Sequence, residues 1–197
     1  MRKSVIGILL ACVLFACSQP VKYDHPHVII KTGLGNIELE LYEDKAPKTV
    51  AAFLEYIDSG YYENTTFYRV LKPENQPSDA FKARLIQGGL WQVKNKLARI
   101  LPGIPHETTQ QTGILHKTGI ISMARAEPGT ATTEFFICLS DQPGFDYGGK
   151  NNADGLGYAA FGKVVKGMGV VKEIYGQPFY NQSFDPPVYI FNIVRLR

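Results

Sequence analysis

Short stretches in which apolar and polar residues alternate recur along this 197-residue chain, and a period of two is typical of half-buried β-strands. The clearest example is GNIELELYED at 35–44, where Ile37, Leu39 and Leu41 share one face while Glu38 and further polar residues lie on the other. The segment HVIIKT and a GLG turn precede it. The pattern predicts a hairpin whose second strand exposes one face to water.

Six further segments have the β-branched and aromatic character of short strands. They are TTFYRVL (65–71), LIQGG (85–89), GIISMA (119–124), EFFICLS (134–140), YAAFGKVV (158–165) and VYIFNIVRL (188–196). Polar or glycine-rich loops connect them, and the longest irregular sections are 90–118 and 141–157. The chain therefore carries eight predicted strands.

Two segments have the periodicity of helices rather than strands. In APKTVAAFLEYIDSG, Val50, Phe53, Leu54 and Ile57 recur at i, i+3, i+4 and i+7, between an early proline and a terminal glycine. GMGVVKEIYG, near the C-terminus, predicts a second and shorter helix. Without a repeat or a domain boundary, these elements predict one mainly-β domain, a closed eight-stranded antiparallel barrel capped by two helices.

The first 20 residues, MRKSVIGILLACVLFACSQP, have the character of an export signal. Arg2 and Lys3 precede an apolar run that is too short to span a bilayer as an ordinary helix. The run ends in LFAC, which resembles the lipobox of bacterial lipoproteins, and this resemblance implies that Cys17 becomes the mature N-terminus and carries lipid. The expected organisation is a lipoprotein signal peptide at 1–16, a lipidated tether at 17–26 and one domain at 27–197.

This leader also predicts where the protein works. The domain is expected in the cell envelope, anchored by lipid and facing the periplasm or the outside. Ser18 after the cysteine is the pattern usually sent to an outer membrane, where the cell has one. The alternative is ordinary signal cleavage, with a cysteine at position 17 by coincidence.

Charge and cysteine content exclude several classes of protein. The net charge of +3 falls to +1 (3 − 2) when Arg2 and Lys3 leave with the signal, and no basic run interleaves with aromatics, so nucleic-acid binding is not expected. Cys12 and Cys17 belong to the leader and its processing point, which leaves Cys138 alone in the domain. A disulfide framework and a cysteine metal site are therefore excluded.

The remaining motifs do not indicate a reactive group. The four histidines, at 25, 27, 106 and 116, have no metal-ligand spacing, and no serine occupies a nucleophile elbow. The glycine segments do not open a helix after a strand, as phosphate-binding loops do. From these absences we expect an activity, if there is one, that needs no nucleophilic side chain, no metal and no cofactor.

Arg69, within TTFYRVL, is a permanent cation in an aromatic strand. One interpretation is structural, with the stem packed on the sheet and the guanidinium in water. The other is functional. Taken alone, this stretch favours the structural interpretation, and the motifs elsewhere in the chain reverse that preference.

Several separated motifs, in the same order, resemble the cyclophilin family of peptidyl-prolyl isomerases over residues 27–197. They are ELYEDKAPKTVAAF (40–53), FYRV (67–70), LIQGG (85–89), ISMARAEPGTATTEFFI (121–137) and YAAFGKVVKGM (158–168). The resemblance implies that Arg69 is catalytic and that Gln87 hydrogen-bonds the substrate backbone beside it. It also implies a proline pocket with Phe136 as its floor, Leu85 as an apolar wall and Tyr158 on its far side.

Four further positions follow from the same resemblance. Ala124 and Arg125 correspond to a ledge for the residue before the proline, contacted mainly through the backbone of 125. Glu134 replaces a more usual glutamine, which brings negative charge toward the catalytic arginine and offers a means of neutralising it. Phe145 lies where cyclosporin-sensitive members have tryptophan, so weak cyclosporin binding is expected.

The chain also departs from the family pattern between its arginine and its glutamine. Arg84 falls where a pocket phenylalanine is usual, and the segment 72–84 reads as an insertion. Either Phe81 from this insertion replaces the missing ring, or the proline pocket lacks one wall.

Elementary chemistry explains why an arginine suits an isomerase. The X–Pro bond is held planar by resonance, with a barrier of about 18–20 kcal/mol, and its nitrogen regains a lone pair only when the bond is twisted. A fixed donor aimed at that nitrogen stabilises the twisted state alone. The expected function is therefore a peptidyl-prolyl cis-trans isomerase (EC 5.2.1.8 type) that acts on proline-containing exported polypeptides and assists their folding.

Two other functions compete with this one. The first is a catalytically weak or idle module of the same fold that binds proline-containing segments as a chaperone or scaffold. The second is a ligand-carrying barrel such as a lipocalin, which the helix at 47–60 and the aromatic EFFICLS core argue against. The protein is expected to be a monomer, although no pattern in the sequence bears on self-association.

Overall fold

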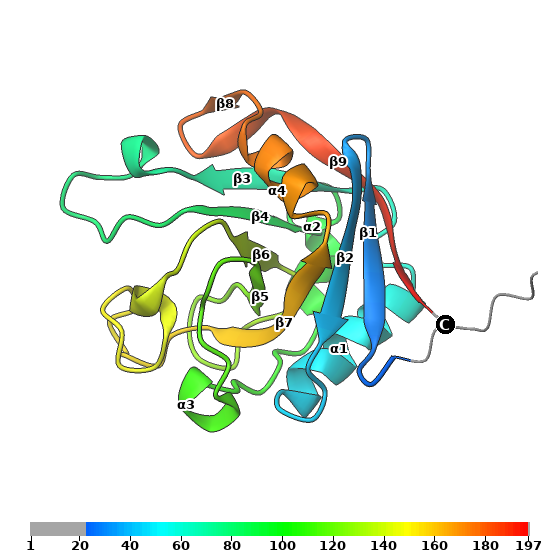
Figure 1. The fold of residues 1–197 in the computed structure, drawn as a ribbon, viewed down its shortest axis with the longest axis horizontal. Helices are drawn as coiled ribbons and strands as arrows, with labels where there is room; N and C mark the ends of the chain where they lie inside the picture. The colour runs from blue at the N-terminus through cyan, green and yellow to red at the C-terminus, as the bar shows by residue number, and fades with distance from the viewer. Residues whose placement is uncertain (1–22, 197) are drawn as a thin grey trace, which may run out of the picture.

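The strands close into a barrel in the computed structural model, which describes residues 23–196 (Figure 1). The described strands are β1 (His27–Thr32), β2 (Gly35–Leu41), β3 (Thr65–Leu71), β4 (Leu85–Gly89), β5 (Ile120–Met123), β6 (Phe135–Cys138), β7 (Ala159–Lys166), β8 (Phe179–Tyr180) and β9 (Ser183–Arg195). Their order is β1-β2-β7-β5-β6-β4-β3-β9, and β9 pairs with β1. The predicted eight-stranded antiparallel barrel is confirmed, with the two-residue β8 added beside β9.

The two predicted helices are α1 (Pro47–Asp58) and α4 (Met168–Tyr175), which lie toward opposite ends of the barrel in Figure 1. The four apolar positions that predicted α1 are all buried. The section 90–118, expected to be irregular, contains two short helices, α2 (Asn95–Ile100) and α3 (Thr109–Thr112). A capping box in which Thr108 and Gln111 cap each other begins α3, and its T-x-x-Q spacing is a signal of this helix in the sequence.

Side-chain alternation gives the barrel wall two apolar faces. Phe135 is fully buried inside the barrel, where its ring contacts those of Phe53 and Phe67 edge to face. Phe136, its neighbour in β6, points to the other side of the wall. There it joins a second buried cluster, consisting of Ala83, Leu85, Phe136, Cys138 and Phe145. The outer face of β4 and β6 is therefore a small apolar site in its own right.

The expected water-exposed face of β2 is wrong at Glu38, of which only 7% is exposed. β2 lies between β1 and β7, and side chains from both strands cover the carboxylate. His27 Nδ1 lies 2.8 Å from one carboxylate oxygen and Lys166 Nζ 3.0 Å from the other. Strand alternation predicts which side a residue faces, but the neighbouring strands decide whether water reaches it.

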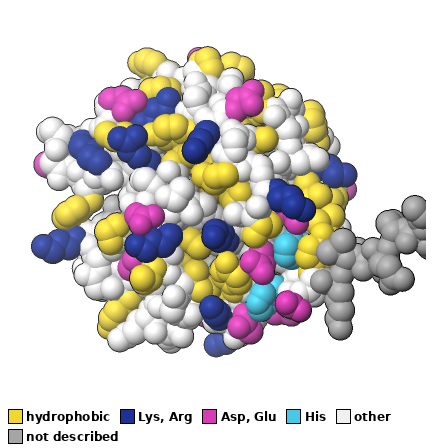
Figure 2. All heavy atoms as spheres, viewed as in Figure 1, with side chains coloured by type: hydrophobic (Ala, Val, Ile, Leu, Met, Phe, Trp, Pro, Cys, Tyr) yellow, Lys and Arg dark blue, Asp and Glu magenta, His cyan; other side chains and the backbone are white. Residues whose placement is uncertain are grey.

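Charges of both signs are interspersed over the face shown in Figure 2, with apolar side chains between them. No helix among residues 23–196 is both long and apolar enough to cross a membrane. The predicted signal peptide at 1–16 and the predicted lipid attachment at Cys17 lie outside the described residues, as does most of the tether.

The ion cluster around Glu38 predicts a stability that depends on pH. Burial raises the pKa of Glu38, but the hydrogen bonds and charges of Lys166 and His27 outweigh it, so the folded pKa lies below the ordinary value of 4.5. A carboxylate of this kind stabilises the fold above its unfolded pKa and loses that contribution as the pH falls through the folded pKa. Glu38→Gln should therefore cost about 1 kcal/mol of unfolding free energy at pH 7 and clearly less at pH 3.

Urea unfolding of the wild type and the variant at both pH values measures this difference. Glu43→Gln, at an exposed position of the following turn, should change stability little at either pH. A cost of Glu38→Gln that stays the same from pH 7 to pH 3 would contradict the assignment.

Candidate active site

Strand register places three of the predicted site residues in one row. Arg69 of β3 is opposite Gln87 of β4, and Gln87 is opposite Phe136 of β6. Residues directly opposite in neighbouring strands have side chains on the same face. Residues from three distant parts of the chain therefore meet on the outer face of the barrel wall.

A break in the register of β3 directs Arg69 to this face. Phe67 is buried in the barrel core, so strict alternation would point Arg69 inward as well. The register shifts between Phe67 and Arg69, however, and Tyr68 is the extra residue. Tyr68 and Arg69 are both half-buried, and Val70 returns to the core. Such β-bulges, which re-aim a side chain, are common beside active sites.

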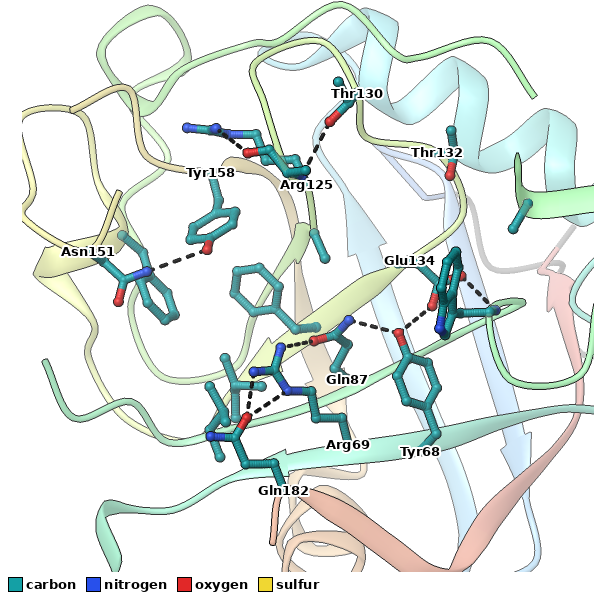
Figure 3. Close-up of a pocket in the computed structure, with 18 of the residues that line it drawn as sticks. Tyr68, Arg69, Gln87, Arg125, Thr130, Thr132, Glu134, Asn151, Tyr158 and Gln182 are labelled. Atoms are coloured by element: carbon teal, nitrogen blue, oxygen red, sulfur yellow. Dashed lines mark hydrogen bonds between the residues drawn. The ribbon is translucent and has the colours of Figure 1, made fainter. Parts of the chain in front are cut away.

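Two neutral amides hold the Arg69 guanidinium in place (Figure 3). Its Nη1 donates to Gln87 Oε1 at 3.2 Å, while Nε and Nη2 donate to Gln182 Oε1 at 3.1 and 2.6 Å. Three of the five N–H donors of arginine are thus engaged, which leaves two. None of the ion pairs formed within residues 23–196 includes Arg69. The positive charge is oriented but not neutralised.

Gln87 continues a chain of hydrogen bonds that ends at Glu134 (Figure 3). Its Nε2 donates to the Tyr68 hydroxyl at 2.8 Å, and this hydroxyl donates to Glu134 Oε2 at 2.6 Å. Burial, together with the Glu134 charge, raises the pKa of Tyr68 far above its usual range, so this tyrosine remains a donor at neutral pH. Because the amide nitrogen of Gln87 bonds Tyr68, the amide oxygen of Gln87 faces Arg69.

The expectation that Glu134 neutralises Arg69 is therefore not met by the geometry. Glu134 Oε1 instead accepts the backbone N–H groups of Leu90 and Trp91 at 2.8 and 3.0 Å. Burial raises the pKa of Glu134, and these hydrogen bonds, with that from Tyr68, oppose the rise. At Gly89, where φ is +145°, a Cβ would lie 2.6 Å from the carboxylate oxygens, which explains the second glycine of LIQGG.

An aromatic box lies beside Arg69. The rings of Phe136, Phe145 and Tyr158 meet pairwise edge to face, with centroids 5.1–5.5 Å apart. Leu85 and Ala83 pack against this cluster. All nine predicted catalytic and substrate-binding residues line one groove of about 930 Å³: Arg69, Leu85, Gln87, Ala124, Arg125, Glu134, Phe136, Phe145 and Tyr158.

Comparison with known proteins agrees with this geometry. Residues 27–195 match the family described as cyclophilin type peptidyl-prolyl cis-trans isomerase/CLD. The chain belongs to the cyclophilin family. The family inferred from the sequence motifs is thereby confirmed, and so is the predicted class of enzyme, a peptidyl-prolyl isomerase.

Curated relatives and solved structures include other cyclophilins. Peptidyl-prolyl cis-trans isomerase A of Dickeya dadantii is 38% identical over 149 residues, which cover 75% of this chain and 70% of that protein. Peptidyl-prolyl cis-trans isomerase B of Escherichia coli is 35% identical over 150 residues, or 76% of this chain and 84% of that protein. A Cryptosporidium parvum cyclophilin, crystallised in the presence of the dipeptide Ala-Pro, matches with a TM-score of 0.65 at 25% identity, covering 85% of this chain and 97% of that one.

Ala124 and Arg125, the residues predicted to form a ledge, both line the groove. The Arg125 side chain turns away and is nearly fully buried, with bidentate contacts of 2.8 and 2.9 Å to Asp154 and a hydrogen bond to the carbonyl of Gly157. The Arg125 guanidinium therefore connects segments of the protein to one another. The guanidinium is engaged within the protein, and a ligand contact through the backbone at 125 stays a prediction.

Of the two expectations for the insertion, the first, in which Phe81 replaces the missing ring, is not met, and the second, a proline pocket without one wall, stays a prediction. Arg84 is exposed and does not line the groove. Its guanidinium interacts with Tyr175 instead. Ala83, which is 1% exposed, takes the inward position beside Leu85. Phe81 lines the groove but is 56% exposed, so it does not fill the place of a buried pocket ring.

Two residues that orient Arg69, one directly and one through Gln87, do not stand out in the sequence motifs. Gln182 lies in the turn between β8 and β9, 113 positions from Arg69, and no local pattern connects the two. Tyr68 was read only as a strand-forming aromatic residue. Its position next to the arginine was visible, but its hydroxyl gains a role only through the bulge.

His116 is a third missed residue, buried beneath the aromatic box. Its Nδ1 lies 2.7 Å from Asp146 Oδ1 and its Nε2 3.0 Å from Ser122 Oγ, and its ring is nearly parallel to that of Phe136. The set has the composition of a hydrolase triad, but Ser122 is fully buried and cannot reach a substrate. We interpret it as a support for the floor of the pocket. No three His, Cys, Asp or Glu side chains within 23–196 are placed to hold a metal ion.

Replacing His116 should destabilise the fold. His116→Leu removes both side-chain hydrogen bonds, so Ser122 loses this partner and Asp146 keeps only the backbone N–H of residue 116, which should cost about 2 kcal/mol of unfolding free energy. Urea denaturation of the variant measures the loss. His25→Leu, a more exposed histidine outside the groove, should cost less than about 0.5 kcal/mol. Equal stability of the two variants would refute the supporting role.

Proposed function

We propose that this cyclophilin catalyses rotation about X–Pro bonds in exported polypeptides and assists their folding in the cell envelope, where lipid on Cys17 holds it. One observation carries the catalytic part of the proposal. An oriented guanidinium with unused donors lies beside an aromatic box in the same groove. The exported part rests on the leader sequence alone.

The pocket supplies the fixed end of the rotation. The proline ring would enter the box of Phe136, Phe145, Tyr158 and Leu85, which is apolar and therefore favours the ring over water. With the ring held, only the acyl side of the bond can turn. The residue before the proline would lie along the backbone at Ala124.

Arg69 supplies an interaction that is stronger in the twisted state of the X–Pro bond than in its planar states. In the planar ground states the imide nitrogen has no available lone pair, whereas the twisted state has one. A donor held in advance at that nitrogen strengthens its hydrogen bond only as the bond rotates, which lowers the barrier without tightening the ground state. Gln87 and Gln182 orient the guanidinium beforehand, so little reorganisation is needed during the reaction.

The alternative is a catalytically weak module that binds proline-containing segments in the same groove. Its sequence support was Arg84 at a pocket position together with the insertion 72–84, and the exposed side chain of Arg84 removes the first of these. We favour catalysis of rotation because the Arg69 guanidinium is oriented in advance and has unused donors.

Arg69→Ala should lower kcat/KM on a short X–Pro peptide by about 10²-fold, the loss typical of removing one donor to a transition state. Because Arg69 is held only by neutral amides, the free energy of unfolding should change by less than about 1 kcal/mol. NMR exchange spectroscopy on the peptide and urea unfolding measure the two quantities. Arg195→Ala, which breaks an exposed ion pair with Asp58 outside the groove, should leave the rate unchanged.

The two outcomes for Arg69→Ala are distinct. Full activity in the folded variant would exclude the catalytic role, and a large loss of stability would make Arg69 a structural residue. A wild-type protein that binds the peptide but gives no rate above the uncatalysed one would favour the binding module.

The envelope location has its own test. Cys17→Ser should abolish incorporation of labelled fatty acid in cells and move the protein from the membrane fraction to the soluble fraction. Cys12→Ser changes a cysteine within the apolar run and should leave labelling intact. Labelling that persists in Cys17→Ser, or a wild type that is never labelled, would reject the anchor.

A further inference from the structure

The inserted connection between β3 and β4 is a built structure rather than a loose loop. We call residues 72–84 the arm; it extends outward at the left of Figure 1 and begins with a single 3₁₀ turn, Pro73–Asn75. The Gln76 side chain connects the beginning of the arm to its end. Its Nε2 donates to the carbonyls of Lys72 and Ala83 at 2.7 and 2.8 Å, and its Oε1 accepts the Ala83 N–H at 3.0 Å.

Gln182 fixes the arm to the catalytic arginine. Its Oε1 accepts two N–H groups of Arg69, and its Nε2 donates to the Asn75 carbonyl at 3.3 Å. The Asn75 side chain in turn donates to the Val70 carbonyl and accepts the Lys72 N–H. One side chain therefore sets the position of both the arginine and the base of the arm.

The groove continues from the aromatic box onto the arm. The lining in this direction includes Leu71, the last residue of β3, and Gln76, Pro77, Ala80 and Phe81 of the arm. This extension is largely apolar. Phe81 presents a ring that is 56% exposed and lies in the same groove as Arg69 and Leu85.

The direction of a bound polypeptide follows from the two ends of the groove. Arg125, on the predicted ledge, and Gln182, at the base of the arm, lie on opposite sides of Arg69 and Gln87 in Figure 3. If the residue before the proline lies on the ledge and the ring fills the box, the chain leaves toward Gln182 and the arm. Phe81 would then meet the residue that follows the proline.

We propose that the arm forms a subsite for the residue after the proline, and that Phe81 makes it select large apolar side chains, above all aromatic ones. This inference rests on the proposed isomerase function and adds a substrate preference to it. An aromatic side chain packed on the exposed Phe81 ring removes apolar surface of both from water. A glycine after the proline would leave the Phe81 ring exposed to water.

The test compares peptides Ala-Ala-Pro-Y, blocked at both ends, with Y as Phe, Leu, Gly or Glu. Full-length protein should give kcat/KM about fivefold higher for Phe than for Gly, mainly through KM, because one apolar contact discriminates only modestly. In Phe81→Ala the ratio of the Phe to the Gly value should fall to about one. Phe81→Tyr, which keeps the ring, should retain most of the preference.

Phe191→Ala is the matched control. Phe191 lies on β9, outside the groove, and is also 56% exposed. Its replacement should leave the Phe-to-Gly ratio at the wild-type value. Exchange spectroscopy gives the rates, and titration of the same peptides gives their dissociation constants.

The outcomes separate this inference from the function on which it rests. Isomerisation with equal kcat/KM for Phe and Gly peptides, or a preference that survives Phe81→Ala, would overturn the subsite and leave the isomerase intact. A preference for Glu would overturn it in favour of the exposed cations Lys82 and Arg84. If no peptide is isomerised, the proposed function fails, and the ratio of dissociation constants in wild type and Phe81→Ala still decides the subsite.

Discussion

A permanent cation on a barrel strand must reach water, and the bulge at Tyr68 meets this constraint in β3. Regular alternation after the buried Phe67 would direct Arg69 into an apolar core, where an unpaired charge costs several kcal/mol. The extra residue turns the guanidinium outward and returns Val70 to the core. The row of site residues exists because of this one irregularity.

The chemistry of the groups that hydrogen-bond Arg69 matters for catalysis as much as the direction of its side chain. Gln87 and Gln182 accept hydrogen bonds from Arg69 without bringing a negative charge to it. A carboxylate in either place would engage the donors more strongly and offset the charge that a developing lone pair needs. Glu134 belongs to the same network, but Gln87 and Tyr68 lie between it and the arginine, so Glu134 orients the site without forming an ion pair.

The barrel wall carries two apolar clusters because its strands are buried on both faces at the site. Ile86 and Ile137 face the interior, while Leu85 and Phe136 face the groove. The outer cluster is held from below by His116, a buried polar residue with both ring nitrogens engaged. The floor of the groove therefore rests on buried groups whose polar atoms are hydrogen-bonded.

The sequence by itself determined the eight barrel strands, two of the helices and the family. Its periods of two and 3.6 marked eight strands and two helices, and separated motifs named the residues that line the groove, because these signals are local or repeated in order. Tertiary structure alone decided the bulge at Tyr68, the contact of Gln182 with Arg69 and the burial of Glu38. It also turned Arg84 away from the pocket. Each of these depends on strand register or on which strands are neighbours, and such pairings join distant residues without leaving a periodic trace in the chain.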